Sequence, residues 1–334
     1  METQTLKSVY GIGNPLIDVI VHISSEDLSN LGIHKGTMQL ITKEQRLELA
    51  DFIKTRKAIY SCGGSCPNTV ITLACLGIPT TLGGKIGDDE FGHIYRKQLE
   101  LDMVKDELRT CSEPTGSSII LVTEDSERTM NTYLGANREY RPEDVVESSV
   151  KNASIFHFTG YMWDTENQKA AIRKALKIAH QANVKVSFDI ADPFAVSRYR
   201  EDFFHLIENE CDIVYANNEE ARILFDNYDA YECCKSMGKL CPVAIVKNGK
   251  RGSFISHHRE IFPIEVSGPQ TAVDTTGAGD TYAAGFLYGI CKGYDIAKSG
   301  EIASYLAGEV IKQVGAQFSM EKIKEIISYL QSIT

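Results

Sequence analysis

The sequence lacks the features that mark membrane, secreted and nucleic-acid-binding proteins. No apolar run is long enough to span a bilayer, and no early run resembles a signal peptide. Basic residues are outnumbered, because 35 Lys and Arg face 45 Asp and Glu, for a formal net charge of −10. That balance argues against a nucleic-acid partner but allows a small anionic ligand, held by local cations. We expect a cytoplasmic monomer or homodimer with no membrane partner.

The cysteines form no pattern that predicts cross-links. There are nine, an odd number, and their scattered spacing fits neither a disulfide framework nor a two-pair zinc site. The adjacent Cys233-Cys234 pair would make only a strained bridge. We therefore expect mainly buried, reduced thiols.

Several catalytic motifs are also missing. The chain has no G-x-x-x-x-G-K-[ST] phosphate loop, no G-x-S-x-G nucleophile turn and no H-E-x-x-H zinc motif. Residues 11–16 begin like a dinucleotide-binding fingerprint, but Leu16 replaces the third glycine and Pro15 opposes the start of a helix. A Walker-type ATPase and a Rossmann dehydrogenase are therefore disfavoured.

What the sequence does contain is an alternation of short apolar runs and amphipathic segments. Expected strands cover 118–122, 184–189, 211–215 and 243–247, and expected helices cover 167–183, 218–226 and 231–241. This order predicts an α/β fold with a doubly wound, mostly parallel sheet and helices on both faces. Ligands bind beyond the carboxyl ends of such strands, where Asp189, Asn217 and Asn248 fall.

The N-terminal third predicts a second, smaller sheet. Residues 9–23 read as a strand interrupted by Gly13-Asn14-Pro15, and residues 115–134 alternate like a hairpin with a turn at 125–127. These pieces are expected to fold over the large sheet as a lid. Asp18 lies inside an apolar strand, so it needs either a substrate hydroxyl or neighbouring backbone donors as a partner.

Residues 274–280, Asp-Thr-Thr-Gly-Ala-Gly-Asp, carry the strongest functional signal. Small residues lead into an apolar helix, so the backbone N–H groups of Gly277, Ala278 and Gly279 are free to face an anion at a helix start. Asp280 at the rim would repel that anion unless it accepts a proton from an attacking hydroxyl. The alternative is a helix cap that contains Asp.

A second glycine pair lies at Gly63-Gly64, ahead of a helix expected over 69–76. Two glycines allow a bend and a close backbone approach, and Ser65 and Asn68 offer groups suited to sugar hydroxyls. Read alone, the segment is equally typical of a turn and a helix start.

Residues 63–68, 84–92 and 274–280 together resemble, in order and separation, the two signatures of the ribokinase, or PfkB, family of carbohydrate kinases. The resemblance covers nearly the whole chain and implies a single ribokinase-like kinase unit over 1–334. Insertions at about 14–40 and 112–137 would form the β-sheet lid, and 138–334 would be mainly the ATP-binding domain. It also implies ATP and Mg²⁺ as cofactors, and K⁺ as an additional candidate.

The resemblance assigns roles to individual residues. Asp280 would be the catalytic base, Gly277, Ala278 and Gly279 the anion hole, and Arg128 a lid cation that faces the phosphoryl group. The substrate would contact Asn14, Asp18, Gly63, Gly64, Ser65, Asn68, Leu134, Ala136 and Tyr161. ATP and its phosphates would contact Asn217, Lys247, Gly249, Gly252 and Thr276, with Glu220 reaching Mg²⁺ through water.

Within the family, residues 13–18, 128–131 and 134–137 are similar to adenosine kinases, whereas 38–40 and 158–163 depart from them. The expected reaction is ATP- and Mg²⁺-dependent phosphorylation of a nucleoside 5′-hydroxyl, adenosine to AMP in purine salvage. Met38, Leu40, Leu134, Ala136 and Tyr161 are candidate walls for the base. The alternatives are a ribokinase- or fructokinase-like sugar kinase and a non-catalytic relative that binds a nucleoside or sugar.

Overall fold

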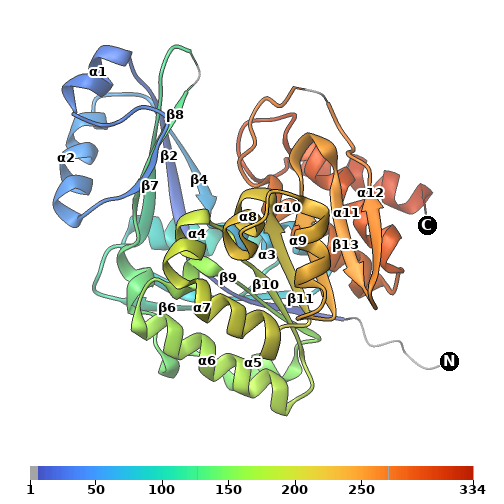
Figure 1. The fold of residues 1–334 in the computed structure, drawn as a ribbon. Coiled ribbons are helices and arrows are strands. Elements are labelled where there is room, and N and C mark those ends of the chain that lie inside the picture. Colours follow the sequence, from blue (N-terminus) through green and yellow to red (C-terminus); the bar gives the residue numbers. More distant parts are fainter. Residues whose placement is uncertain (1–6, 126, 270, 334) are drawn as a thin grey trace.

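Two β-sheets organise the chain in the computed structural model, which describes residues 7–125, 127–269 and 271–333 (Figure 1). The large sheet has nine strands in the order β14-β13-β12-β11-β10-β9-β1-β5-β6. Neighbours from β12 to β6 are parallel, and the pairs β12–β13 and β13–β14 are antiparallel. The strands are β1 (Val9–Ile12), β5 (Thr80–Gly87), β6 (Lys105–Cys111), β9 (Ile155–Thr159), β10 (Lys185–Asp189), β11 (Ile213–Asn217), β12 (Val243–Lys247), β13 (Ser253–His257) and β14 (Glu260–Ile264).

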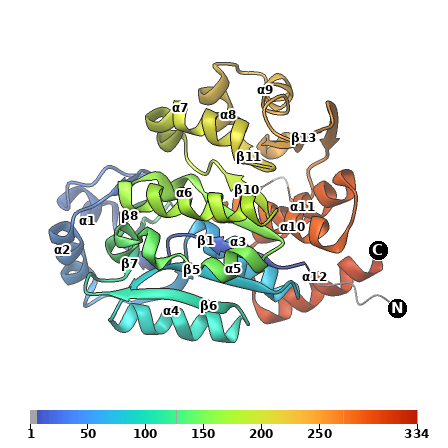
Figure 2. The same ribbon diagram turned by 90° about the horizontal axis from the view of Figure 1, so that it is seen from below.

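Helices cover both faces of this sheet, as the sequence predicts (Figure 2). One face carries α5 (Glu147–Asn152), α6 (Glu166–Gln181), α7 (Pro193–Asn209), α8 (Asn218–Phe225) and α9 (Ala230–Met237). The other carries α3 (Ser65–Cys75), α4 (Glu90–Leu101), α10 (Ala278–Lys292), α11 (Ile296–Val310) and α12 (Met320–Ser332). The central strands are therefore buried on both sides, which explains their continuous apolar runs.

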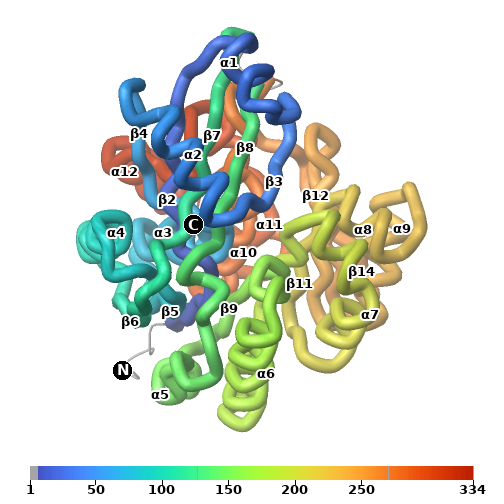
Figure 3. The backbone as a smooth tube through the Cα atoms, turned by 90° about the vertical axis from the view of Figure 1, so that its left-hand side faces the viewer, coloured from blue at the N-terminus to red at the C-terminus, as the bar shows by residue number. Residues whose placement is uncertain are grey.

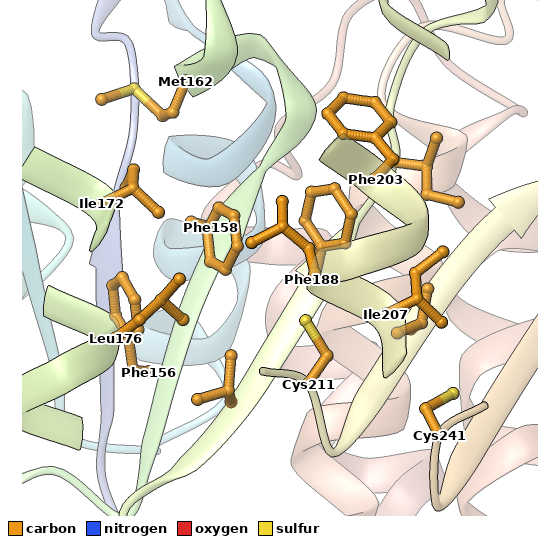
Figure 4. Close-up of a cluster of buried hydrophobic side chains, with 14 of the residues drawn as sticks. Phe156, Phe158, Met162, Ile172, Leu176, Phe188, Phe203, Ile207, Cys211 and Cys241 are labelled. Carbon is orange, nitrogen blue, oxygen red and sulfur yellow. The ribbon is translucent and has the colours of Figure 1, made fainter. Parts of the chain in front are cut away.

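A cluster of aromatic side chains fixes the strands that end at the cleft (Figure 4). Phe158 from β9 stacks on Phe188 from β10 with ring centroids 4.8 Å apart, and Phe203 from α7 meets Phe188 edge-on at 5.3 Å. All three rings are fully buried. Such pairs contribute about 0.5–1.5 kcal/mol each beyond their buried area, so they hold β9 and β10 in a defined register.

The second sheet has five strands in the order β3-β8-β7-β2-β4. They are β2 (Leu16–His22), β3 (Met38–Leu40), β4 (Ala58–Gly63), β7 (Gly116–Val122) and β8 (Arg128–Tyr133), and helices α1 (Ser25–Asn30) and α2 (Lys43–Ile53) cover one face. Figure 3 shows these strands and the two helices, in blue and green, gathered in the upper part of the view. The predicted hairpin is confirmed as the antiparallel pair β7–β8. Of its turn, Ser126 lies outside the described residues.

Element boundaries differ from the sequence-based prediction in a few places. Helix α3 begins at Ser65, four residues early, because Gly64 with its positive φ of 108° provides the turn. Helix α9 ends at Met237, and strand β11 begins only at Ile213. Residues 9–12, expected in the lid, form the central strand β1 of the large sheet instead. Strand β4 belongs to the small sheet although it lies outside both predicted insertions. The nine cysteines are all free, and six are buried.

Candidate active site

A cavity of about 1020 Å³ lies where the carboxyl ends of the central strands meet the start of α10. Strands β10, β11 and β12 end at Asp189, Asn217 and Lys247, and all three line it. The inner face of the small sheet supplies further lining residues, among them Asp18 and Met130. This is the binding edge predicted for a doubly wound sheet. Of the three residues predicted there, Asp189 and Asn217 line the cavity and Asn248 does not.

The start of α10, the predicted anion-binding turn, lies within this cavity. Gly277 has a left-handed φ of 75°, and a Cβ at this position would lie 2.4 Å from the Cβ of Ala316. No side chain caps the helix, and Ala278 and Gly279 both line the cavity. The Ala278 N–H, predicted to be free for an anion, instead donates to the Thr275 carbonyl at 3.2 Å, because the chain turns back on itself there. The preceding Thr276 is held by Asp274, whose carboxylate accepts from the Thr276 N–H at 3.0 Å and from its hydroxyl at 2.7 Å.

Asp280 is held from the opposite side by the first turn of α3. The Ser65 hydroxyl donates to one carboxylate oxygen at 2.6 Å, and the Asn68 amide donates to the other at 2.9 Å. Burial raises the pKa of Asp280 to about 6, while these two hydrogen bonds oppose that rise. Ser65 and Asn68 were predicted to bind substrate, and in this structure both position the predicted base.

Lys247 lies beneath the same turn. Its ammonium is 2.9 Å from a carboxylate oxygen of Asp189, and a Cβ placed on Gly279 would lie only 3.2 Å from it. Burial alone would lower the pKa of Lys247, but the carboxylates of Asp189 and Glu220 raise it above its usual value. The predicted phosphate-site lysine therefore stays cationic directly behind the anion-binding turn.

Glu220 and Asn217 form a capping box at the start of α8. The Glu220 carboxylate accepts from the Asn217 backbone N–H at 2.7 Å and from its side-chain amide at 2.6 Å. Burial raises the pKa of Glu220 to about 7. Both oxygens are engaged, so this carboxylate fits a hydrated Mg²⁺, reached through water, better than a bare ion. Gly249 and Gly252 also line this part of the cavity.

The predicted substrate residues gather at the other end. Asn14 accepts a hydrogen bond from Gln168 at 2.9 Å and donates to the carbonyl of Tyr161 at 3.2 Å, which ties the β1–β2 link to the end of β9. Burial raises the pKa of Asp18 to about 7. Gly64 is packed so closely that a Cβ would lie 2.1 Å from the carbonyl oxygen of Asn14.

Four of the five predicted apolar wall residues line the cavity, and three predicted site residues do not. Met38, Leu40, Leu134 and Tyr161 line the cavity, but Ala136, Gly63 and Arg128 do not. Ala136 is fully buried, and its backbone N–H donates to the carbonyl of Pro114 at 2.8 Å. Gly63 packs under the carboxylate of Asp18. Arg128 forms an ion pair with Asp274, which links β8 to the segment before α10.

Other lining residues were missed by sequence reasoning. Asp164, Asp192, Phe194, Arg198 and Tyr199 follow the ends of β9 and β10 and line the cavity, with Phe194 74% exposed. Their one sequence signal was Asp192-Pro193, a typical helix start. Gln317, which does not line the cavity, was also missed: its amide donates to the carbonyl of Cys62 at 2.7 Å, beside the Gly63-Gly64 pair.

Comparison with known proteins assigns the family. The family model described as pfkB family carbohydrate kinase matches residues 31–323. The chain belongs to this family. It is accordingly a phosphotransferase with an alcohol group as acceptor, with a ribokinase-like fold, and the family generally uses ATP and Mg²⁺.

Individual relatives carry both nucleoside and sugar kinase names. The crystal structure of adenosine kinase from Sinorhizobium meliloti is 34% identical, with a TM-score of 0.88 over 99% of this chain and 100% of that one. A probable sugar kinase from Rhizobium etli CFN 42 is 35% identical, with a TM-score of 0.87 over 96% and 98% of the two chains. An uncharacterized sugar kinase of Archaeoglobus fulgidus is 32% identical over 73% of this chain and 96% of its own. No helix in the described part of the chain is long and apolar enough to cross a membrane.

Proposed function

We propose that this protein transfers the γ-phosphoryl group of ATP to the 5′-hydroxyl of a nucleoside, with adenosine as the preferred acceptor and AMP as the product. The observation that carries the proposal is that Asp280 lies in the first turn of a helix whose start no side chain caps, in a cavity with apolar walls. Within this one helical turn, the carboxylate can accept the proton of an attacking hydroxyl, and the backbone N–H groups can bind the phosphoryl group that the hydroxyl attacks.

In the proposed reaction, Asp280 accepts the proton of the 5′-hydroxyl while the hydroxyl oxygen forms a bond to the γ-phosphorus. The bond from that phosphorus to the bridging oxygen breaks, and ADP leaves. A carboxyl with a pKa of about 6 is deprotonated at neutral pH, yet basic enough to accept this proton. The N–H groups at the start of α10 and the Lys247 ammonium face the charge that develops on the phosphoryl oxygens.

The carboxylates around Lys247 suit a divalent cation. Three acidic side chains, those of the buried Asp189 and Glu220 and the partly buried Asp280, surround the single ammonium of Lys247. A bound Mg²⁺, which Glu220 would hold through water, would neutralise phosphate charge. A role for K⁺ remains a prediction.

Residue choice supports a nucleoside as the acceptor. Asp18, from the small sheet, presents a partly buried carboxyl group to the cavity, where it is suited to paired ribose hydroxyls. Met38, Leu40, Leu134 and Tyr161 offer apolar surface for a base. Stacking on a base contributes about 1–3 kcal/mol, enough to favour a nucleoside over free ribose. A sugar kinase is the second candidate, because relatives of similar identity carry that name.

We also propose that the small sheet acts as a lid on a single kinase unit, with 138–334 holding mainly ATP. A phosphoryl group must be protected from water while the hydroxyl attacks. The ion pair between Arg128 on β8 and Asp274 joins the small sheet to the anion-binding segment. When phosphate is bound, Arg128 would exchange Asp274 for the transferring group.

A screen of ATP consumption tests the function. Adenosine, inosine, guanosine, cytidine, ribose and fructose are compared under identical conditions, with Asp280→Asn as the matched blank. General-base catalysis contributes about a hundredfold to ten-thousandfold, so the variant should bind substrates but turn over at least a hundredfold more slowly. Faster turnover of ribose or fructose than of every nucleoside contradicts the nucleoside assignment, and near-normal turnover by Asp280→Asn contradicts Asp280 as the base.

A further inference from the structure

The pairing of Lys247 with Asp189 bridges two strands that are not neighbours. Asp189 ends β10, Lys247 ends β12, and β11 lies between them. The two side chains meet above Tyr215 of β11, with the ammonium 6.0 Å from that ring. The side chain of Asp189 is 5% exposed and that of Lys247 is 15% exposed. A buried pair of this kind needs a reason, because desolvating two charges is expensive even when they attract.

The ammonium has other carboxylates within electrostatic reach. Glu220 and Asp280 both raise the pKa of Lys247, yet the hydrogen bond is made to Asp189. The Lys247 ammonium has three N–H donors, and within the described part of the chain Asp189 is the one residue that accepts a hydrogen bond from it. The spare donors lie against Gly279, in the first turn of α10.

Asp189 is itself fixed in place. Its other carboxylate oxygen accepts the backbone N–H of Ala191 at 3.0 Å, so the side chain is anchored by its own loop. The carboxylate is therefore a rigid support for a lysine whose long, flexible stem would otherwise allow several positions.

We propose that Asp189 is a positioning residue for phosphoryl transfer. It holds the Lys247 ammonium behind Gly279, facing the group being transferred, and keeps it from pairing with Asp280, which would block the base. The proposal rests on the phosphotransferase reaction of the proposed function but not on the identity of the acceptor.

The sign of the effect distinguishes positioning from simple electrostatics. Removing the negative charge of Asp189 makes the cavity more positive, which by itself favours ATP binding and stabilises phosphoryl charge. A positioning role predicts the opposite for turnover, because a freed Lys247 moves to Asp280 or Glu220.

A double-mutant cycle provides the test, using Asp189→Asn, Lys247→Met and the double variant. We expect Asp189→Asn to lower kcat on the order of tenfold to a hundredfold while KM for ATP changes less than about threefold. In the Lys247→Met background, Asp189→Asn should lower kcat no further, since the residue it positions is gone. The matched control is Asp144→Asn, which breaks a similarly buried lysine pair, Lys85–Asp144 at 2.7 Å, away from the cavity. It should lose stability and keep its kcat.

Three results would overturn the proposal: effects of the two variants on kcat that multiply, an unchanged or raised kcat in Asp189→Asn, or equal losses of kcat in Asp189→Asn and Asp144→Asn. Should Asp189→Asn fail to fold, Asp189→Glu replaces it in the cycle, since it keeps the charge and displaces the carboxylate.

The cycle uses whichever acceptor the screen identifies, so rejection of nucleosides in favour of sugars overturns the acceptor assignment alone. If no acceptor is found, the affinity ratio of MgATP to MgADP replaces kcat. Each single variant should then reduce that ratio, again without multiplying, and effects that multiply overturn the proposal.

Discussion

At the scale of the residue, burial and hydrogen bonding together set the pKa of Asp280, the proposed base. Burial raises that pKa to about 6, and the Ser65 hydroxyl limits the rise by donating at 2.6 Å. A carboxyl is active as a base only when deprotonated, so kcat should fall as pH drops through about 6. Ser65→Ala removes a donor that favours the charged form, and should therefore move this inflection to higher pH.

The measurement is kcat against pH between 5 and 9 for the wild type and Ser65→Ala. The control is Thr42→Ala, which removes the hydroxyl that caps α2, a helix that covers the small sheet. It should leave the inflection of the kcat profile in place. An inflection that does not move in Ser65→Ala would show that Ser65 does not tune the base.

At the scale of the element, the turn at Gly64 joins β4 to α3 and brings the small sheet against the catalytic helices. Its φ is 108°, and an added Cβ would lie 2.1 Å from the Asn14 backbone oxygen. Gly77, just after α3, also has a positive φ, 83°, but no atom lies within 4 Å of its added Cβ. Gly64→Ala combines strain with a backbone clash, whereas Gly77→Ala adds strain alone, about 1–2 kcal/mol.

We therefore expect Gly64→Ala to lower the free energy of unfolding clearly more than Gly77→Ala does, as measured by denaturant titration. Gly64→Ala should also raise KM and lower kcat together, because the shift displaces Asn14 and α3. Equal destabilisation by the two variants would show that the Gly64 turn adapts without strain on the site.

Elements with a local signal were predictable from the sequence. Strand β12 was predicted at its observed bounds, 243–247, because both of its faces are buried and its apolar run is continuous. The β7–β8 hairpin was predicted from two strand-like segments in 115–134 that flank a polar turn. The anion-binding turn followed from small residues that lead into a helix. In each case a few neighbouring residues determine the structure.

Contacts between distant segments were not predictable in this way. The bond from Ser65 to Asp280 spans 215 residues, and the Asp189–Lys247 pair spans 58. Strand β4 has polar and apolar residues without clear alternation, so its place at the edge of the small sheet depends on pairing with β2. Such features follow from the packing of the whole chain, which no short pattern encodes.

At the scale of the whole molecule, the site concentrates buried carboxyl groups that oppose stability. Burial raises the pKa of Asp18 and Glu220 to about 7 and that of Asp280 to about 6. The native state therefore binds more protons than the unfolded chain between about pH 4 and 7. Stability from these groups is fully present below about pH 4 and is lost as pH rises through their native pKa values.

Asp280→Asn should therefore stabilise the fold at pH 8 while it slows turnover at least a hundredfold. The pKa of Asp280 lies about two units above its usual value of 3.8, so removing the charge contributes about 1–3 kcal/mol at pH 8, less whatever the changed bonds to Ser65 and Asn68 remove. That advantage should shrink toward pH 4, where the wild-type carboxyl is largely protonated in the native state. Denaturant unfolding at pH 4 and pH 8 measures the difference, with Asp88→Asn, whose side chain is 80% exposed, as the control that should show almost none. A variant less stable than the wild type at pH 8, or an advantage that grows toward pH 4, would show that Asp280 is not destabilised by burial and that its fitness as a base has another origin.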